Sequence, residues 1–278
     1  MQTATRAIVI TGASSGLGAA LAVEYAQAGH ILGLVARNER RLEDVAARCA
    51  GAGAHCVTGL IDVTDRIALG RWIDAFDAQY PIDLLFVNAG VYAGHGPGGQ
   101  METIEEILWQ IGTNLQGAAI TIGAVLPAMR RRRRGRIVLI ASLAGLQCLA
   151  DAPGYSATKA GLIAYGEALR EYLAPDRISV SIVCPGYIET PQTAHHVGAL
   201  PLQMSPRRAA AIIRRRVDRG RSLVAFPLRL YLLVRLGRLV GWRTRAFFGR
   251  GLRFHTEKPP AQRAEAVRSQ EDFREIDP

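Results

Sequence analysis

The sequence is poor in cysteine and has no cysteine pair at the spacing of a metal or redox motif. Its four cysteines are scattered and lie in apolar or helical surroundings: Cys49, Cys56, Cys148 and Cys184. This pattern excludes a disulfide framework or a C-x-x-C site as the basis of the fold. We expect the cysteines to be reduced and buried, as in a cytoplasmic protein.

Two further features are missing, a secretory signal and a run long enough to span a membrane. Residues 1–6 lead into an apolar segment without the charged, apolar and cleavage regions of a signal peptide, so we expect no export. In the leucine-rich part after residue 226, the longest uncharged run is 230–234, far below the ~20 residues that a spanning helix needs. The predicted location is the cytoplasm, with the inner membrane surface as an alternative because this part is also basic.

Acidic residues are scarce late in the chain, and arginine is concentrated in two places. Fifteen Arg or Lys stand against two acids between Ser205 and Lys258, and consecutive arginines occupy 130–134. An arginine run can neutralise nucleic-acid phosphates, but no aromatic stacking platform accompanies this one. At a helix end, cations also suit the helix dipole. We therefore predict a solvated cationic helix end and no nucleic-acid partner.

The chain is long enough for one large domain, with 278 residues of which 49% are hydrophobic. Short apolar, β-branched segments alternate with helical segments over most of its length. This alternation predicts an α/β fold with a Rossmann-like, doubly wound parallel sheet of about seven strands, covered by helices on both faces. We expect ligands to bind across the carboxyl ends of the strands.

A glycine-rich turn joins the first apolar segment, Ala7 to Thr11, to a helix expected from Ala19 to Ala28. Glycine lets the backbone turn sharply and approach a pyrophosphate, and a helix N-terminus presents free N–H groups to it. A tight turn without a ligand is the alternative, but the order of strand, glycine turn and helix favours a dinucleotide site. The expected contacts are Gly12, Ser14, Ser15, Gly16, Leu17 and Gly18.

The second apolar segment, Ile31 to Ala36, ends without an acid. In a dinucleotide site an acid there would bind the ribose 2′-hydroxyl, whereas a basic residue accommodates a 2′-phosphate. Arg37 stands directly after the segment. We predict NADP as the cofactor, with NAD as the less favoured choice. The alternative is that Arg37 only caps a surface loop.

Two later segments also end in candidate cofactor contacts at the same edge of the sheet. One of these residues, Asp62, can accept a hydrogen bond from the adenine amino group. It can equally be the N-cap of the helix that begins near Asp65. The expected contacts at these two strand ends are Asp62, Val63, Asn88, Ala89 and Gly90.

A phenol and an ammonium lie four residues apart in a helical segment, at Tyr155 and Lys159. Residues i and i+4 share a helix face, so both side chains can reach one cleft. A nearby cation favours the phenolate, which allows Tyr155 to give or take a proton near neutral pH. Taken alone, the pair also fits a half-buried tyrosine and a solvated lysine.

In their order and intervals, these motifs resemble those of the short-chain dehydrogenase/reductase family, in its shorter single-domain branch. The resemblance reaches to about residue 225 and implies an NAD(P)-dependent enzyme that interconverts a carbonyl and an alcohol. It rests on Thr11-Gly12-x-x-x-Gly16-x-Gly18, Asp62, Asn88-Ala89-Gly90, Asn114, Ser142, Tyr155-x-x-x-Lys159 and Pro185-Gly186.

The resemblance also implies roles for four polar side chains. Tyr155 would be the general acid or base, and Lys159 would lower its pKa and bind the nicotinamide ribose. Ser142 would hold the substrate oxygen, and Asn114, inside a helix expected over Leu108–Met129, would keep a water relay to Lys159. The residues alone leave alternatives open, because such a serine is often only a strand-end turn and such an asparagine a satisfied core amide.

A turn after the segment Ile178 to Cys184 would lie over the nicotinamide, again by resemblance, and contact it through Pro185, Gly186, Ile188 and Thr190. Residues 191–206 lack periodicity and are expected to form a lid on the substrate side. Two adjacent histidines, His195 and His196, invite a metal site. No acid or further histidine accompanies them, so we predict no metal.

Beyond the resemblance, leucines, aromatics and arginines mix over 227–258. The pattern predicts an amphipathic, basic and apolar extension after the catalytic domain, 1–226. A polar tail, 259–278, follows and is expected to be partly disordered. The extension can wall the substrate pocket, pack on a second subunit, or lie on an anionic membrane.

These features together predict an NADP-preferring oxidoreductase that acts on an apolar carbonyl compound or alcohol. The alternative is a dinucleotide-binding redox sensor or membrane-associated scaffold that lacks the reaction. The intact polar set argues against that alternative, since a sensor needs only the cofactor half. We expect a homodimer or homotetramer, because in the family the helices that would carry Asn114 and Tyr155 often pair between subunits.

Overall fold

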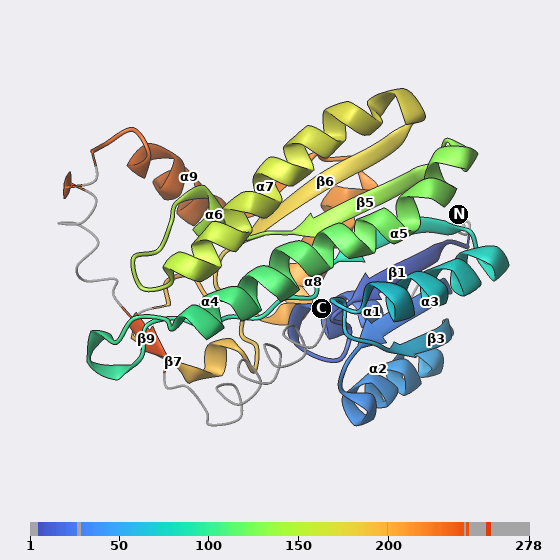
Figure 1. The fold of residues 1–278 in the computed structure, drawn as a ribbon, viewed down its shortest axis with the longest axis horizontal. Coiled ribbons are helices and arrows are strands. Elements are labelled where there is room, and N and C mark those ends of the chain that lie inside the picture. The colour runs from blue at the N-terminus through green and yellow to red at the C-terminus, as the bar shows by residue number, and fades with distance from the viewer. Residues whose placement is uncertain (1–4, 27–28, 199, 242, 245–253, 257–278) are drawn as a thin grey trace, which may run out of the picture.

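Seven parallel strands form the central sheet of the computed structural model, which describes residues 5–26, 29–198, 200–241, 243–244 and 254–256. The strand order is β3-β2-β1-β4-β5-β6-β8, and Figure 1 shows the helices on both sides of it. The strands are β1 (Ala7–Thr11), β2 (Ile31–Ala36), β3 (His55–Leu60), β4 (Ile82–Val87), β5 (Gly135–Ile140), β6 (Ile178–Pro185) and β8 (Leu223–Phe226). The predicted fold class is confirmed.

The order of the strands creates a switch point beside β1. The chain runs outward from β1 to β2 and β3, then returns to place β4 on the other side of β1. Val9 of β1 pairs in parallel with Gly33 of β2 and with Leu85 of β4. In open parallel sheets of this kind, ligands bind outside the carboxyl ends of the strands where the order reverses.

Two layers of helices explain why the strands are continuous apolar runs. Helices α1, α2 and α8 cover one face and bury Leu21 and Ile213 against the sheet. Helices α3, α5 and α7 cover the other face and bury Ile122 and Leu162. The helices are α1 (Gly16–Ala26), α2 (Glu39–Gly51), α3 (Arg66–Gln79), α4 (Ile104–Ile111), α5 (Gly117–Arg132), α6 (Leu143–Leu146), α7 (Pro153–Leu173), α8 (Pro206–Asp218) and α9 (Leu228–Gly237).

The helix expected over Leu108–Met129 is interrupted by a π turn. Helix α4 ends at Ile111, the π turn η2 (Gly112–Gln116) follows, and α5 continues from Gly117. The turn contains Asn114, which is fully buried. Single π turns inside α-helices are frequent at functional sites. Periodicity alone could not reveal this one, because one extra residue in a turn barely disturbs an apolar pattern.

The arginine run at the end of α5 folds back onto the amino-end edge of the sheet. Three of its members form ion pairs: Arg130 with Asp176 at 2.7 Å, Arg132 with Asp77 at 2.5 Å and Arg134 with Asp83 at 2.7 Å. The expectation of a solvated helix end was therefore wrong only for Arg132, whose side chain is 29% exposed, whereas the paired side chains of Arg130 and Arg134 are 45% and 75% exposed. Their acidic partners are far away in sequence, which is why the run looked unpaired.

The C-terminal part begins with α9 and later adds a strand to a second, small sheet. Strand β9 (Phe254–Thr256) pairs antiparallel with β7 (His196–Gly198), which lies in the predicted lid. No helix in the described part of the chain is long and apolar enough to cross a membrane. The predicted polar tail, 259–278, lies outside the described residues.

Candidate active site

A cavity of about 1240 Å³ opens at the carboxyl ends of the strands. Every residue expected to contact the cofactor lines it, from the glycine-rich turn to Thr190. Ser142, Tyr155 and Lys159 line it as well, whereas Asn114 lies behind the wall that its neighbour Thr113 forms. The structure thus brings together nearly the whole set of predicted site residues in one cavity.

The glycine-rich turn is built for close backbone approach. Gly12 has a φ of 67°, and a Cβ added to it would lie 2.8 Å from the Cα of Ala89. A Cβ on Gly18 would lie 2.2 Å from the Gly12 carbonyl oxygen, so the start of α1 packs directly on the turn. These contacts leave an open cradle at the N-terminus of α1, where N–H groups favour a pyrophosphate. The residues present therefore fit a dinucleotide.

Asn88 and Thr11 clamp the turn to the end of β4. The Asn88 Nδ2 donates to the Thr11 carbonyl at 2.9 Å. The Thr11 Oγ1 accepts from the backbone N–H groups of Asn88 and Ala89, both at 3.1 Å. Two loops that are far apart in sequence are held together at the floor of the cavity.

At the outer end of the cavity, Arg37 forms an ion pair with Asp62, with 3.2 Å between Nη1 and Oδ2. Asp62 does not cap α3, because Asp65 is the N-cap and accepts from the first turn of that helix. Instead Asp62 accepts from the Thr64 N–H and hydroxyl at 2.9 and 2.8 Å. Arg41 lines this end too and was missed from the sequence, although it stands only four residues after Arg37, in the first turn of α2.

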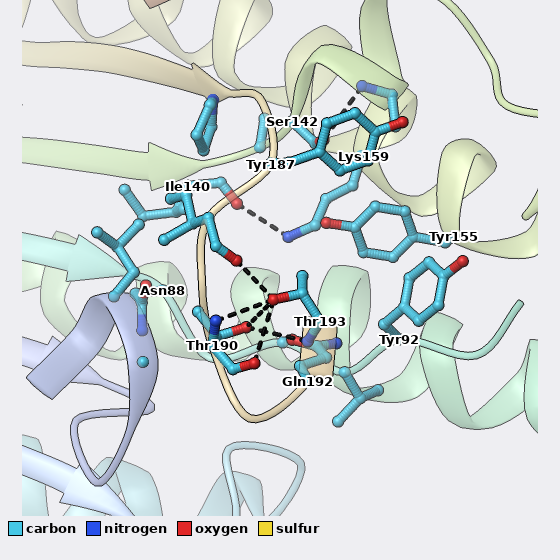
Figure 2. A pocket seen from close by; sticks show the side chains of 18 of the residues that line it. Asn88, Tyr92, Ile140, Ser142, Tyr155, Lys159, Tyr187, Thr190, Gln192 and Thr193 are labelled. Atoms are coloured by element: carbon cyan, nitrogen blue, oxygen red, sulfur yellow. Dashed lines mark hydrogen bonds between the residues drawn. The ribbon is translucent and has the colours of Figure 1, made fainter. Parts of the chain in front are cut away.

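Tyr155 and Lys159 extend from the first two turns of α7 into the opposite end of the cavity (Figure 2). The Lys159 Nζ donates to the Ile140 carbonyl at 2.9 Å and lies 5.6 Å from the centre of the Tyr155 ring. The alternative of a solvated lysine is wrong, because only 4% of the Lys159 surface is exposed. The i, i+4 spacing did predict that both side chains share one face.

Burial sets the pKa of both groups. It raises the pKa of Tyr155 to about 12, although a hydrogen bond with the Ser142 side chain acts in the opposite direction. Burial also lowers the pKa of Lys159 to about 8, while the nearby Cys184 opposes this shift. The sequence led us to expect a lowered pKa for Tyr155, and the structure shows the opposite. At neutral pH Tyr155 is thus a protonated phenol beside a mostly charged ammonium.

Ser142 follows β5 and begins the short helix α6. Its Oγ accepts from the Ala144 N–H at 3.1 Å, so it caps that helix. The same side chain bonds the Tyr155 phenol and lines the cavity. The strand-end role and the position beside the phenol therefore coexist.

Asn114 has all the marks of a satisfied core amide. Its Oδ1 accepts from the Val91 N–H at 2.7 Å, and its Nδ2 donates to the Val91 carbonyl at 2.9 Å and to the Thr158 Oγ1 at 3.1 Å. Asn114 thus joins the loop after β4, at Val91, to helix α7, at Thr158, the residue before Lys159. A Cβ on Gly90 would lie 3.2 Å from the Asn114 Oδ1 and 3.5 Å from the Lys159 Nζ, so the amide oxygen and the ammonium lie close to the same side of Gly90.

A buried carboxylate at the start of α7 was not found from the sequence. Glu102 is only 6% exposed; its Oε2 accepts from the Gly154 N–H at 2.7 Å, and its Oε1 accepts from the Gln110 Nε2 at 2.8 Å. Gln110 in turn accepts from the Ala93 N–H at 3.0 Å. No local signal marks Glu102, because it lies in a loop 52 residues before its partner.

The turn after β6 closes over the cavity from above the glycine-rich turn. A Cβ on Gly16 would lie 3.0 Å from the Thr190 methyl group. The Thr193 Oγ1 donates to the Ile188 carbonyl at 2.7 Å, and its backbone N–H donates to the Thr190 Oγ1 at 3.2 Å (Figure 2). Pro185 and Gly186 line the cavity beside this turn.

The inner end of the cavity, beside Tyr155, is mostly aromatic and apolar, although a few polar side chains also line the cavity. The Tyr92 ring meets the Tyr155 ring edge-on at 5.0 Å and the His196 ring at 4.7 Å. Other residues of this wall are Leu146, Leu149, Tyr187, Leu230, Leu233 and Val234. Burial lowers the pKa of His196 to about 4, which keeps the imidazole neutral. Among the described residues, no group of three or more His, Cys, Asp or Glu could hold a metal ion.

Comparison with known proteins agrees with this geometry. The short chain dehydrogenase family matches residues 6–198. An uncharacterized oxidoreductase of Myxococcus xanthus is 34% identical over 236 residues, 84% of this chain and 92% of that protein. A monensin polyketide synthase putative ketoacyl reductase of Streptomyces virginiae is 37% identical over 195 residues, 68% and 73% of the two chains. The solved structure of a short-chain dehydrogenase from Sphingobium yanoikuyae, in complex with NADPH, is 29% identical with a TM-score of 0.73, covering 87% and 95%.

The chain therefore belongs to the short chain dehydrogenase family. It is an oxidoreductase of that family, as the ordered motifs predicted. The family match ends at residue 198, before the end of the region 191–206 in which a lid was predicted and before the predicted C-terminal extension.

Proposed function

We propose that this oxidoreductase interconverts an apolar ketone or aldehyde and the matching alcohol, with NADP as the preferred cofactor. The observation that carries the proposal is the placement of Ser142, Tyr155 and Lys159 in the same cavity as the glycine-rich turn. When bound, the nicotinamide supplies or accepts the hydride. The chain's own residues hold the carbonyl and move one proton.

Tyr155 is the proposed proton donor in the reductive direction. Burial keeps its phenol protonated at neutral pH, so it can neutralise the charge that develops on the carbonyl oxygen. The Lys159 ammonium stabilises the resulting phenolate, and Ser142 holds the substrate oxygen beside the phenol. Asn114, which lies close to the same side of Gly90 as the ammonium, is the proposed start of a water relay that returns a proton.

The preference for NADP rests on two guanidinium groups at the outer end of the cavity. Arg37 and Arg41 both line this end, next to the carboxyl end of β2 where a 2′-phosphate would lie. A guanidinium has five N–H donors, so the ion pair with Asp62 is compatible with a phosphate contact. The similar protein of Sphingobium yanoikuyae contains NADPH in its solved structure, which supports the choice.

The substrate is proposed to be apolar because the inner wall of the cavity consists mostly of apolar and aromatic side chains. Its lining includes Tyr92, Tyr187 and Leu149, and Leu230 and Val234 of α9. Of the three uses that the sequence left open for the C-terminal extension, the role of pocket wall thus has direct contacts behind it. The name of the similar Streptomyces virginiae protein, a ketoacyl reductase, supports a ketone as the reacting group.

A homodimer or homotetramer remains the proposed assembly, with 1–226 as the catalytic domain and 227–258 as the extension. Helix α4 exposes Ile104, Leu108 and Ile111 along one side, at helical spacing. This stripe supports pairing of α4 with a second copy. Gel filtration of wild type and Leu108→Glu tests it, since the charge should split a dimer that uses this stripe.

The experiment that tests the function is a titration with NADPH and NADH by fluorescence, followed by NADPH oxidation with cyclohexanone, menthone and decanal. We expect tighter binding of NADPH and turnover of at least one of the three carbonyl compounds. Equal or tighter binding of NADH contradicts the cofactor preference. Failure to bind either nucleotide contradicts the assignment of the whole cavity.

A further inference from the structure

Helix α9 presents a leucine-rich side to solvent. The exposed apolar residues of this helix and the turn after it are Leu228, Leu232, Leu233, Leu236, Leu239 and Val240. Most of them are spaced three or four residues apart and therefore share one side of the helix. Leu236 is 63% exposed and Leu239 is 83% exposed. A contiguous exposed apolar patch of this kind marks an interaction site.

The opposite side of α9 belongs to the cavity. Val234 is buried, and Leu230 and Val234 line the inner wall. A Cβ on Gly237 would lie 2.6 Å from the Gln147 Oε1, so α9 packs closely against the end of α6 (Figure 1). Leu233 is both exposed and part of the cavity wall. An apolar surface therefore continues from the outside of α9 into the cavity.

The positive charge on and around α9 indicates which kind of partner its leucine side can bind. No Asp or Glu occurs between Asp218 and Glu257, while Arg229 and Arg235 are exposed on α9. Two copies packed face to face through this side would set arginines against arginines, which like-charge repulsion disfavours. Leucines flanked by arginines instead complement a surface that is apolar inside and anionic at its rim.

We propose that α9 docks on the surface of an anionic lipid bilayer. The leucine side enters the boundary between head groups and acyl chains, and Arg229 and Arg235 meet the lipid phosphates. The helix lies in the surface, because it is too short to cross a bilayer. An apolar substrate then passes from the lipid along Leu233 into the cavity. This last step rests on the proposed function, whereas the docking itself does not.

Vesicle co-sedimentation of the full chain tests the docking. The probes are vesicles of phosphatidylcholine alone and vesicles of phosphatidylglycerol and phosphatidylcholine in equal parts. We expect binding to the anionic vesicles that weakens as salt is added. A triple variant, Leu232→Ser/Leu236→Ser/Leu239→Ser, should weaken binding more than about a hundredfold, since none of these side chains lines the cavity. Arg229→Gln/Arg235→Gln should weaken binding to the anionic vesicles about thirtyfold.

The matched control is Ile67→Ser, because Ile67 is also a large apolar residue, 66% exposed, but lies on α3. It should bind vesicles like wild type. NADPH binding and oxidation with cyclohexanone, measured without vesicles, should be unchanged in all these variants and show that they are folded.

Three outcomes overturn the inference: wild type that does not bind the anionic vesicles, a triple variant that binds like wild type, or a triple variant whose only change is a smaller assembly in gel filtration. The last result assigns the leucine side to a second copy. Wild type that oxidises NADPH without binding vesicles overturns the docking alone. Wild type that binds vesicles without oxidising NADPH contradicts the proposed function alone.

Discussion

The Glu102 carboxylate accepts a hydrogen bond from the Gly154 backbone N–H at 2.7 Å, one residue before Tyr155. Gly154 lies in the first turn of α7, where the helix dipole favours a negative charge. Glu102 also holds Gln110 of α4, so it ties the helix that precedes the π turn to the helix that carries the phenol. The position of Tyr155 in the cavity thus depends on a loop residue far from it in sequence.

Replacement of Glu102 by Gln should therefore lower turnover through the position of Tyr155. The Gln side chain has one oxygen and one NH2 group, so its NH2 group would face either the Gly154 N–H or the Gln110 NH2 group, both of which are donors. One buried hydrogen bond would be lost, at a cost of about 1–3 kcal/mol in stability. A small shift of α7 is expected to reduce kcat about tenfold or more, with NADPH binding nearly unchanged. Steady-state kinetics and a fluorescence titration measure the two effects separately.

Glu106→Gln is the control for this change. Glu106 is equally buried and accepts from the Thr103 N–H at 2.9 Å in the capping box of α4, but it does not contact α7 through that bond. It should lose stability without a comparable loss of kcat. If both variants lose kcat equally, Glu102 has only a structural role.

Removal of the two guanidinium groups at the outer end of the cavity should weaken the preference for NADPH. Each charge-assisted hydrogen bond to a phosphate contributes about 1.5–3 kcal/mol, so Arg37→Ala and Arg41→Ala should each lower the ratio of kcat/KM for NADPH over NADH about tenfold or more. Arg40→Ala, on the same helical turn but outside the cavity lining, is the control and should leave the ratio unchanged. A wild-type ratio near unity, or one that Arg37→Ala does not alter, contradicts the assignment.

The lowered pKa of Lys159 predicts that the rate of ketone reduction falls on the alkaline side of its pH profile. The ammonium is charged below its pKa of about 8 and loses its charge above it. Reduction of a ketone should therefore be level at lower pH and fall about tenfold per pH unit above about 8, because a neutral amine no longer stabilises the phenolate. Lys159→Arg keeps a charge at all these pH values, so its residual activity should lack this fall. The same fall in Lys159→Arg would show that another group causes it.

The same shift has a consequence for stability. In the folded chain Lys159 releases its proton near pH 8, whereas in the unfolded chain it does so near 10.5. Between these values the unfolded state binds more protons, so this group makes the folded state more stable as the pH rises.

Arg132 should contribute measurably to stability through its bidentate ion pair with Asp77. The two guanidinium nitrogens lie 2.5 and 2.8 Å from the two carboxylate oxygens, and the Asp77 side chain is only 11% exposed. Arg132→Ala leaves that carboxylate without its cation and should lower the free energy of unfolding by about 1–2 kcal/mol. Arg131→Ala, at the same helix end but exposed, should change it by less than about 0.5 kcal/mol. Urea denaturation of both variants decides the point, and equal midpoints contradict the role of the ion pair.

The parts of the site that local pattern could predict are those that lie at strand ends. The glycine-rich turn, Asn88 and the Tyr155–Lys159 pair each follow a recognisable strand or share a helix face, and the parallel sheet brings such ends together. The sheet itself was predictable because burial on both faces leaves continuous apolar segments.

The parts that could not be predicted depend on partners distant in sequence. Glu102 has no motif of its own, and its meaning comes from Gly154. Strand β7 forms only because β9 supplies the other half of its ladder. The direction of the pKa shift at Tyr155 was wrong because burial outweighs the hydrogen bond with Ser142, and burial depends on the packed cavity.

The most direct test of the account is the effect of Tyr155→Phe on NADPH oxidation with a carbonyl compound that wild type reduces. This change removes one oxygen and keeps the ring that packs against Tyr92. The account predicts a loss of turnover of about a hundredfold to ten-thousandfold, with the NADPH dissociation constant nearly unchanged. A variant that keeps a substantial fraction of wild-type turnover would show that the proton comes from elsewhere and would contradict the central claim.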